Sequence, residues 1–298
     1  MKIYLTGGTG FIGSYVAKEL SAAGHTVVIL ARNPGKVPAL ATLTGVRIAH
    51  APMQDRAALD AALEQPDALI HVALCWGDTG PEMIRNETLA SVELIELAIR
   101  KGTKRVLFTS STAASGYSLR VTDEDSRLKP EDFYGASKGA VELFVHAYAR
   151  KHPDVHFNII RPGYTFGNPV VDGGSIESDK RFKEICANAK AGRPIALVKN
   201  DGTQFIWAGD LARLYRAVLE GDVTGETFYG LSTKFVRWDE IAGWAKELTG
   251  SKSEIQLSDL GYSDDPSTFA VDKIARFFSL AFDPREKLKE HLRYLLSV

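Results

Sequence analysis

A glycine-rich segment near the start of the chain constrains the fold more than any other feature. In residues 4–20, YLTGGTGFIGSYVAKEL, an apolar run is followed by glycines and then by a run with helical spacing. Gly7, Gly10 and Gly13 form GxxGxxG, and glycine permits both a sharp strand-to-helix turn and close approach of a ligand to the backbone. The free N–H groups at a helix start suit a pyrophosphate. The segment predicts a dinucleotide-binding loop, with a turn that binds nothing as the alternative.

The pattern of apolar residues then alternates between two kinds of segment. Short β-branched runs occupy residues 3–6, 26–30, 46–49, 68–72, 106–110 and 157–160, and helical spacing occupies 11–23, 55–63, 84–101 and 131–151. Strands that alternate with helices imply a parallel sheet covered on both faces. We therefore expect an α/β fold built on a Rossmann-type, doubly wound parallel sheet.

The second half of the chain is less regular. After Arg161 the segment RPGYTFGNPVVDGGS is rich in glycine and proline, as in a loop that forms part of a pocket. Further helices are expected at 176–191, at 209–220, from Trp238 and near the C-terminus, with strands at 194–198 and 226–231. We predict an NAD(P)-binding domain over residues 1–162. A smaller substrate-binding lobe over 163–298 would interleave with the last strands of the sheet.

Composition argues against several classes of partner. The 298 residues include 36 Lys and Arg against 37 Asp and Glu, so no excess charge favours nucleic acid or an anionic membrane. Cys75 and Cys186 lie far apart, and no leader-like segment or long apolar run is present, so we expect a cytoplasmic protein. His146, His152 and His156 share no face of one element, so we expect no metal site.

The end of the second strand bears on the choice of cofactor. An acidic residue there would accept hydrogen bonds from the adenosine ribose, whereas this chain has Ala31 and Arg32. A guanidinium suits the 2′-phosphate of NADP because it stays charged and binds phosphate oxygens with a planar fork. Arg32 favours NADP, and NAD remains open because a lone arginine can also be a solvated surface residue.

A second pattern provides groups for proton transfer. Tyr134 and Lys138 are four residues apart in a helix-like run, so both lie on one face, where the ammonium can stabilise a phenolate. Tyr134 can then exchange a proton with a carbonyl or alcohol oxygen. Hydroxyl groups also follow the fifth strand, where ligands of open parallel sheets bind. These hydroxyl groups belong to Thr109, Ser110, Ser111 and Thr112.

Taken together, these motifs resemble those of a known family. Besides GxxGFIG at residues 7–13 and YxxxK at 134–138, the chain contains LIHVAL at 69–74, IIRPGYTFG at 159–167 and FIWAGDLARLYRAVLE at 205–220. It resembles an extended short-chain dehydrogenase/reductase of the NAD-dependent epimerase/dehydratase group. The resemblance covers most of the chain.

The resemblance implies roles for individual residues. Ser111 would orient the substrate oxygen, Tyr134 would be the acid/base, and Lys138 would be its electrostatic partner and would hydrogen-bond the nicotinamide ribose. It also implies a homodimer formed through helices 84–101 and 131–151. Residues expected to contact the cofactor are Gly7, Gly10, Phe11, Ile12, Gly13, Arg32, Met53, Ala73, Tyr134, Lys138 and Pro162.

Departures from the family pattern concern the substrate. Thr203 stands where sugar-nucleotide members usually have an arginine for the diphosphate, and Tyr164 stands in place of an asparagine. Trp207 replaces a usual histidine, and Trp76 follows the fourth-strand motif. Aromatic groups suggest an apolar or ring-shaped substrate. The expected substrate contacts are Trp76, Ser111, Tyr164 and Trp207.

Three functional hypotheses follow. The first is an oxidoreductase that transfers hydride between a nicotinamide and a carbonyl or secondary alcohol of a small substrate. The second is an NAD-dependent nucleotide-sugar epimerase or dehydratase, which would return the hydride to the sugar. The third is a non-catalytic protein that senses NADP, although such a protein would be expected to lose Tyr134 or Lys138, and this chain has both.

Overall fold

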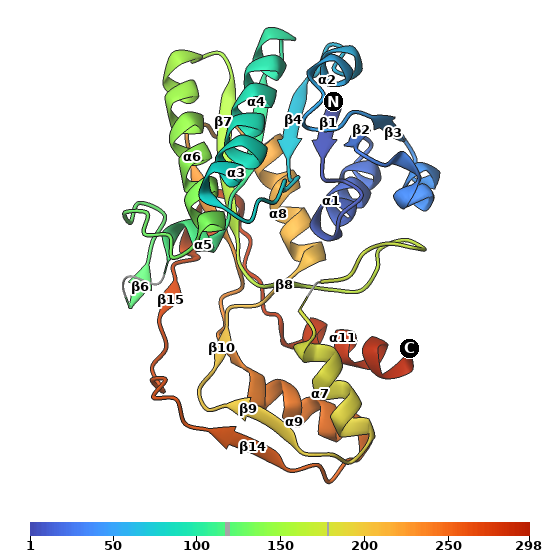
Figure 1. Cartoon of the computed structure of the whole chain (residues 1–298), viewed down its shortest axis with the longest axis vertical. Helices are drawn as coiled ribbons and strands as arrows, with labels where there is room; N and C mark the ends of the chain where they lie inside the picture. Colours follow the sequence, from blue (N-terminus) through green and yellow to red (C-terminus); the bar gives the residue numbers. More distant parts are fainter. Residues whose placement is uncertain (117–119, 178) are drawn as a thin grey trace.

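The computed structural model describes residues 1–116, 120–177 and 179–298, and a seven-stranded parallel sheet lies at its centre (Figure 1). Its strand order is β12-β7-β5-β4-β1-β2-β3, and every neighbouring pair is parallel. The strands are β1 (Lys2–Thr6), β2 (Thr26–Ala31), β3 (Val46–His50), β4 (Ala68–His71), β5 (Arg105–Thr109), β7 (His156–Pro162) and β12 (Thr227–Gly230). The doubly wound α/β sheet expected from the sequence is confirmed. Its order reverses between β1 and β4, where such sheets bind their ligands.

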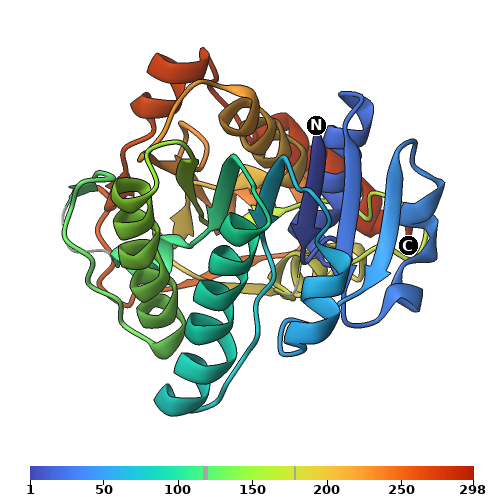
Figure 2. The same cartoon turned by 90° about the horizontal axis from the view of Figure 1, so that it is seen from above.

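Helices cover both faces of this sheet (Figure 2). One layer contains α1 (Phe11–Ala22), α8 (Ala208–Glu220) and α10 (Asp272–Phe278). The opposite layer contains α2 (Arg56–Ala62), α4 (Ala90–Arg100) and α6 (Phe133–Lys151). Both faces of the strands are therefore buried, which explains why the strand segments read as continuous apolar runs.

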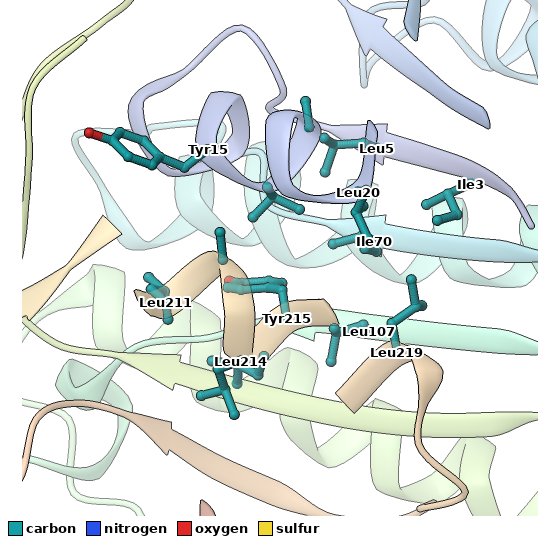
Figure 3. Close-up of a cluster of buried hydrophobic side chains, with 14 of the residues drawn as sticks. Ile3, Leu5, Tyr15, Leu20, Ile70, Leu107, Leu211, Leu214, Tyr215 and Leu219 are labelled. Carbon is teal, nitrogen blue, oxygen red and sulfur yellow. The ribbon is translucent and has the colours of Figure 1, made fainter. Parts of the chain in front are cut away.

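Strand β1 shows how the sequence assigns side chains to the two layers. Ile3 and Leu5 point into the layer of α1 and α8, whereas Tyr4 points into the opposite layer, and all three are fully buried. Figure 3 shows Tyr215 and Leu219 of α8 beneath the strand side chains of the first layer. Each such buried apolar side chain contributes about 1.5–3 kcal/mol to folding. Helix α8, although late in the chain, is thus part of the core beneath the first strands.

A smaller group of elements lies below the sheet in Figure 1. It contains α7 (Arg181–Lys190), α9 (Trp238–Thr249), α11 (Arg285–Ser297), β9 (Ile195–Val198) and β14 (Ile255–Ser258). Its core is aromatic, with Phe182, Phe205 and Trp238 in edge-to-face contact. Short two-stranded ladders join β6 (Val121–Thr122) to β15 (Thr268–Phe269), β8 (Thr165–Phe166) to β11 (Ile206–Trp207), and β10 (Gly202–Thr203) to β13 (Val236–Arg237). Two elements from the second half of the chain, α8 and β12, return to the main sheet. The domain boundary at residue 162 stays a prediction.

Two helices begin four or more residues away from their expected first residue. Helix α7 begins at Arg181 rather than residue 176. Its N-cap residue, Lys180, makes no side-chain capping bond, and Asp179 Oδ1 accepts the Arg181 N–H at 2.8 Å just before the helix. The helix expected at 84–101 begins earlier, as α3 (Gly80–Met83), where Thr79 and Glu82 form a capping box. It continues through a π-helical turn, η3 (Ile84–Leu89), into α4. No helix within the described residues is long and apolar enough to cross a membrane.

Candidate active site

The glycine loop brings the start of α1 against the end of β1. Gly7 adopts a left-handed conformation, with φ of 71°, and its carbonyl accepts the Gly10 N–H at 2.8 Å. A Cβ on Gly13 would lie only 2.2 Å from that carbonyl oxygen. Only glycine therefore allows α1 to begin so close to the loop. Because Gly10 caps α1 without a side chain, the first N–H groups of the helix stay available to an anion.

A cleft of about 610 Å³ opens in front of this loop, at the point where the strand order reverses. Of the residues predicted to contact the cofactor, those lining it are Gly7, Gly10, Phe11, Ile12, Gly13, Arg32, Met53 and Ala73. Tyr134, Lys138 and Pro162 are not among the lining residues. The glycine loop and the free helix start fit the pyrophosphate of a dinucleotide, since a Cβ on Gly7 would clash with the Ala73 backbone and a Cβ on Gly13 with the Gly7 carbonyl oxygen.

Other residues of the cleft were not identified from the sequence. They are Thr9, Leu30, Ala31, Lys36, Ala51, Gln54, Val72, Leu74, Cys75, Gly163, Thr165, Ser175, Ile176 and Glu177. Lys36 could have been found, because it is a second cation four residues after Arg32. Ser175 belongs to the loop that was expected to form part of a pocket, whereas Ile176 and Glu177 were expected in a helix and reach the cleft only through the tertiary fold.

Two cations stand at the end of the cleft formed by β2. Arg32 and Lys36 both line it, and both side chains are exposed. Within the part of the chain that the structure describes, neither has an ion-pair partner. Asn33 accepts the Gly35 N–H at 3.0 Å and so fixes the 3-10 turn η1 (Pro34–Lys36) that carries Lys36. The pair forms an unneutralised positive group beside the expected adenosine ribose.

The wall formed by the segment after β4 is fixed by buried polar contacts. Thr6 Oγ1 accepts the N–H groups of Val72 and Ala73, each at 3.2 Å, and is hydrogen-bonded to His71 Nδ1 at 2.6 Å. His71 Nε2 bonds Ser91 Oγ at 2.8 Å. Burial, followed by the nearby charge of the YxxxK lysine, lowers the pKa of His71 to about 3. His71 is therefore neutral near pH 7 and serves to hold the cleft wall.

Tyr134 and Lys138 lie on the first two turns of α6. Asp132 caps this helix by accepting the Gly135 N–H at 2.6 Å. Lys138 is buried, and its Nζ donates to a Glu87 carboxylate oxygen at 2.6 Å. The half-buried ring of Tyr134 stacks on Trp76.

The hydroxyl group predicted to orient the substrate lies at the end of β5. Ser111 caps the short helix α5 (Thr112–Ser115), its Oγ accepts the Ala113 N–H at 3.1 Å, and its side chain is nearly buried. A Cβ on Gly135 would lie 2.3 Å from the Ala113 carbonyl oxygen, so α6 presses closely against α5. The fold thus brings the segment of Ser111 beside the helix that carries the tyrosine. No hydrogen bond joins Ser111 to Tyr134 among the described residues.

The aromatic residues expected at the substrate occupy different places. Trp76 lies beside Tyr134 and is 60% exposed. Tyr164 instead packs against Phe205 in the aromatic core of the lower elements. Trp207 packs edge-to-face on Tyr15 of α1. Neither Tyr164 nor Trp207 lines the cleft, because each one fills a joint between packed elements.

A buried network also links the C-terminal helix to the cleft. Glu177, which lines the cleft, is hydrogen-bonded through its Oε1 to His291 Nε2 of α11 at 2.8 Å. His291 Nδ1 bonds Asn168 Oδ1 at 2.7 Å, and Tyr15 donates to the Asn168 carbonyl oxygen at 2.6 Å. Sequence analysis missed these partners because they are more than 100 residues apart.

Comparison with known proteins now identifies the family. Residues 3–229 match the model of the NAD dependent epimerase/dehydratase family. The chain belongs to this family. It is accordingly an NAD(P)-dependent enzyme of the extended short-chain dehydrogenase/reductase type, as the sequence motifs indicated. The hypothesis of a non-catalytic sensor is set aside.

Individual relatives share less than a third of their aligned residues with this chain. The chain is 29% identical to a probable UDP-glucuronate 4-epimerase of Rhizobium meliloti over 57% of its length and 55% of that protein. It is 26% identical to UDP-glucuronic acid decarboxylase 5 of Arabidopsis thaliana, over 98% of this chain and 87% of that one. A crystal structure of the UDP-glucuronic acid 4-epimerase of Bacillus cereus with NAD superposes with a TM-score of 0.82, covering 100% and 99% of the two chains at 18% identity. At that identity the structural likeness shows the fold alone.

Proposed function

We propose that this enzyme is an NADP(H)-dependent oxidoreductase that interconverts a carbonyl group and a secondary alcohol on a small, apolar or ring-shaped substrate. The observation that carries the cofactor preference is the pair Arg32 and Lys36, two exposed cations that line one end of the cleft without ion-pair partners among the described residues. Guanidinium and ammonium groups suit the 2′-phosphate that distinguishes NADP from NAD.

The proposed chemistry assigns one task to each side chain of the site. Ser111 and Tyr134 donate hydrogen bonds to the carbonyl oxygen and polarise it, and Tyr134 then gives its proton to the forming alkoxide. Lys138 stabilises the phenolate that remains. A bound nicotinamide supplies or accepts the hydride at the substrate carbon. In the opposite direction, the phenolate of Tyr134 removes the proton of the alcohol.

A nucleotide-sugar epimerase or dehydratase remains the second candidate. The names of the Rhizobium and Arabidopsis relatives support it. Two features of this chain oppose it. Thr203, where sugar-nucleotide enzymes usually have an arginine, lies in the β10–β13 ladder, and Tyr164 is packed in the aromatic core. A hydroxyl group cannot neutralise a diphosphate as a guanidinium does.

Two measurements test the proposal. Native mass spectrometry of the purified protein identifies the nucleotide that copurifies, and a panel of carbonyl compounds is then followed at the absorbance of reduced nicotinamide. The oxidoreductase consumes NADPH with at least one carbonyl, and Tyr134→Phe abolishes this turnover. An epimerase would retain its nucleotide and show no net consumption. Turnover by Tyr134→Phe within a few-fold of the unchanged enzyme would defeat the catalytic assignment.

We also propose a homodimer formed through η3 and α6. Five large apolar side chains are exposed on these elements: Ile84 at 60%, Leu89 at 49%, Phe133 at 59%, Leu143 at 65% and Phe144 at 47%. Exposed apolar groups of this size on neighbouring helices are typical of a subunit interface. Light scattering during size-exclusion chromatography tests it, and Leu143→Glu should give a monomer. The cytoplasmic location also stays a prediction.

A further inference from the structure

Glu87 is a buried carboxylate that the proposed chemistry does not use. It is 1% exposed and lies in the π-helical turn η3. One of its oxygens accepts from Lys138 Nζ at 2.6 Å, and the other accepts from the Cys75 N–H at 2.7 Å. A buried carboxylate is costly unless its oxygens are paired, and here each oxygen has one donor. These two donors belong to different parts of the expected cofactor site.

The first donor is the lysine of the YxxxK pattern. Lys138 is 2% exposed, and its Nζ also lies 5.1 Å from the ring centre of Phe108 on β5. Glu87 is the carboxylate that pairs with this ammonium, so it sets the position and the local charge of the group expected to contact the nicotinamide ribose. The second donor belongs to the cleft wall, where Ala73, Leu74 and Cys75 follow β4.

The neighbouring residue supports the same segment. Asn86 Nδ2 donates to the Trp76 carbonyl oxygen at 3.0 Å, directly after the Cys75 contact. Consecutive residues of one turn thus hold Cys75 of the cleft wall and Trp76, which follows it. The π-helical conformation widens this turn, and such turns occur frequently at functional sites.

We propose that Glu87 is a positioning residue, which fixes Lys138 and the cleft wall of residues 73–75 in one arrangement through the two oxygens of a single carboxylate. This inference rests on the proposed cofactor binding. Glutamine at position 87 would place an amide N–H₂ against the ammonium or against the Cys75 N–H. At least one of the two contacts would then be lost, and the cofactor would bind a less ordered site.

A second buried ion pair provides a matched control. Glu142 on α6 accepts two hydrogen bonds from the Arg161 guanidinium, at 2.9 and 2.7 Å, and both residues are buried. This pair joins α6 to β7, and neither residue lines the cleft. Its disruption should therefore reproduce the general damage of removing a buried ion pair without the effect on the cofactor.

The test measures cofactor affinity by titration calorimetry with NADPH and with NADH, and the thermal midpoint of each variant. Glu87→Gln should weaken binding of the preferred cofactor about tenfold. Glu142→Gln should lower the thermal midpoint by a similar amount but should change the cofactor affinity by less than about twofold. Glu87→Asp, which keeps the charge, should restore affinity to within about threefold. The double variant Glu87→Gln/Lys138→Met should weaken cofactor binding by less than the product of the two single effects, because each single change already removes the same Glu87–Lys138 contact.

The possible failures are distinguishable. Equal cofactor affinities for Glu87→Gln and Glu142→Gln would overturn the positioning role while leaving the proposed oxidoreductase intact. Independent, multiplicative effects of the changes at positions 87 and 138 would also overturn it. If the unchanged protein binds neither NADPH nor NADH, both this inference and the proposed function are wrong.

Discussion

The phenol ring of Tyr134 lies against the indole of Trp76, with ring centroids 6.2 Å apart and an angle of 29° between the planes. The Trp76 Nε1–H donates to Asp78 Oδ1 at 3.1 Å. The indole thus packs against the proposed acid/base, and Trp76 is 60% exposed. We expect a ring of the substrate to contact this indole, so that the segment after β4 contributes to the choice of substrate.

Replacing this indole should change substrate binding more than chemistry. Aromatic pairs contribute about 0.5–1.5 kcal/mol beyond their buried area, so Trp76→Ala should raise KM by about tenfold with a smaller change in kcat. Trp76→Phe should stay within about threefold. The measurement uses the best carbonyl compound of the panel, and Trp244→Phe in the lower elements is the control. Equal KM values for Trp76→Ala and the unchanged enzyme would argue against a substrate contact.

The two cations of the cleft should determine the cofactor preference. Arg32→Asp should weaken NADPH binding at least about tenfold more than NADH binding, because a carboxylate repels the 2′-phosphate and can accept hydrogen bonds from the ribose. Lys36→Glu should shift the preference in the same direction. Titration calorimetry with both nucleotides measures the change. Arg47→Asp, an exposed position on β3 outside the cleft, is the control. Equal losses for both nucleotides would contradict the proposed NADP preference.

The start of α1 should tolerate no side chain at the third glycine of the motif. Gly13→Ala would bring a Cβ to 2.2 Å from the Gly7 carbonyl oxygen and force the helix away from the loop. Cofactor binding should fall by more than about a hundredfold, since both the backbone donors and the dipole move. Gly243→Ala, where a Cβ would meet nothing within 4 Å, should instead stabilise α9 by about 0.5–1 kcal/mol. Nucleotide titration and chemical denaturation compare them, and retained affinity in Gly13→Ala would refute the steric argument.

The buried histidine of β4 should make stability depend on pH. The folded-state pKa of His71, about 3, lies below its ordinary value of 6.5, so as the pH falls the unfolded chain binds the proton first. This residue should therefore remove about 2 kcal/mol of stability between pH 7 and pH 5, with further loss toward pH 3. Denaturant unfolding at both pH values measures it. In His71→Asn, the loss of unfolding free energy between pH 7 and pH 5 should be smaller by about 2 kcal/mol. An unchanged loss would show that His71 is not its cause.

Local sequence patterns were sufficient for the sheet and for the glycine loop that lines the cleft. Gly7, Gly10 and Gly13 are close in sequence because the loop they form is local, and the alternating apolar runs reflect sheet faces that are both buried. Tyr134 and Lys138 are likewise close in sequence, one helical turn apart. When two candidate site residues belong to the same element, a single segment of sequence is enough to identify them.

The missed residues depend on contacts between distant segments. Glu87 meets Lys138 across 51 residues, and nothing in its own segment distinguishes it from a solvated glutamate on a helix. Glu177 was missed because its partner, His291, comes from the last helix. Tyr164 and Trp207 pack against Phe205 and Tyr15 and do not line the cleft, and their contact with a substrate stays a prediction. Aromatic residues in pockets and between packed elements look alike in sequence, and only the fold shows which environment each one occupies.

The position of α8 has a consequence for how the chain can be divided. This helix comes from the second half of the sequence but lies under β1, β4 and β5, where Tyr215 bonds Thr109 at 2.6 Å. A fragment ending at residue 162 would leave that apolar surface facing water, and would be expected to aggregate rather than to fold as an independent nucleotide-binding module. Any attempt to exchange the lower elements between relatives must therefore keep α8 with the first half of the chain, as a graft in two pieces.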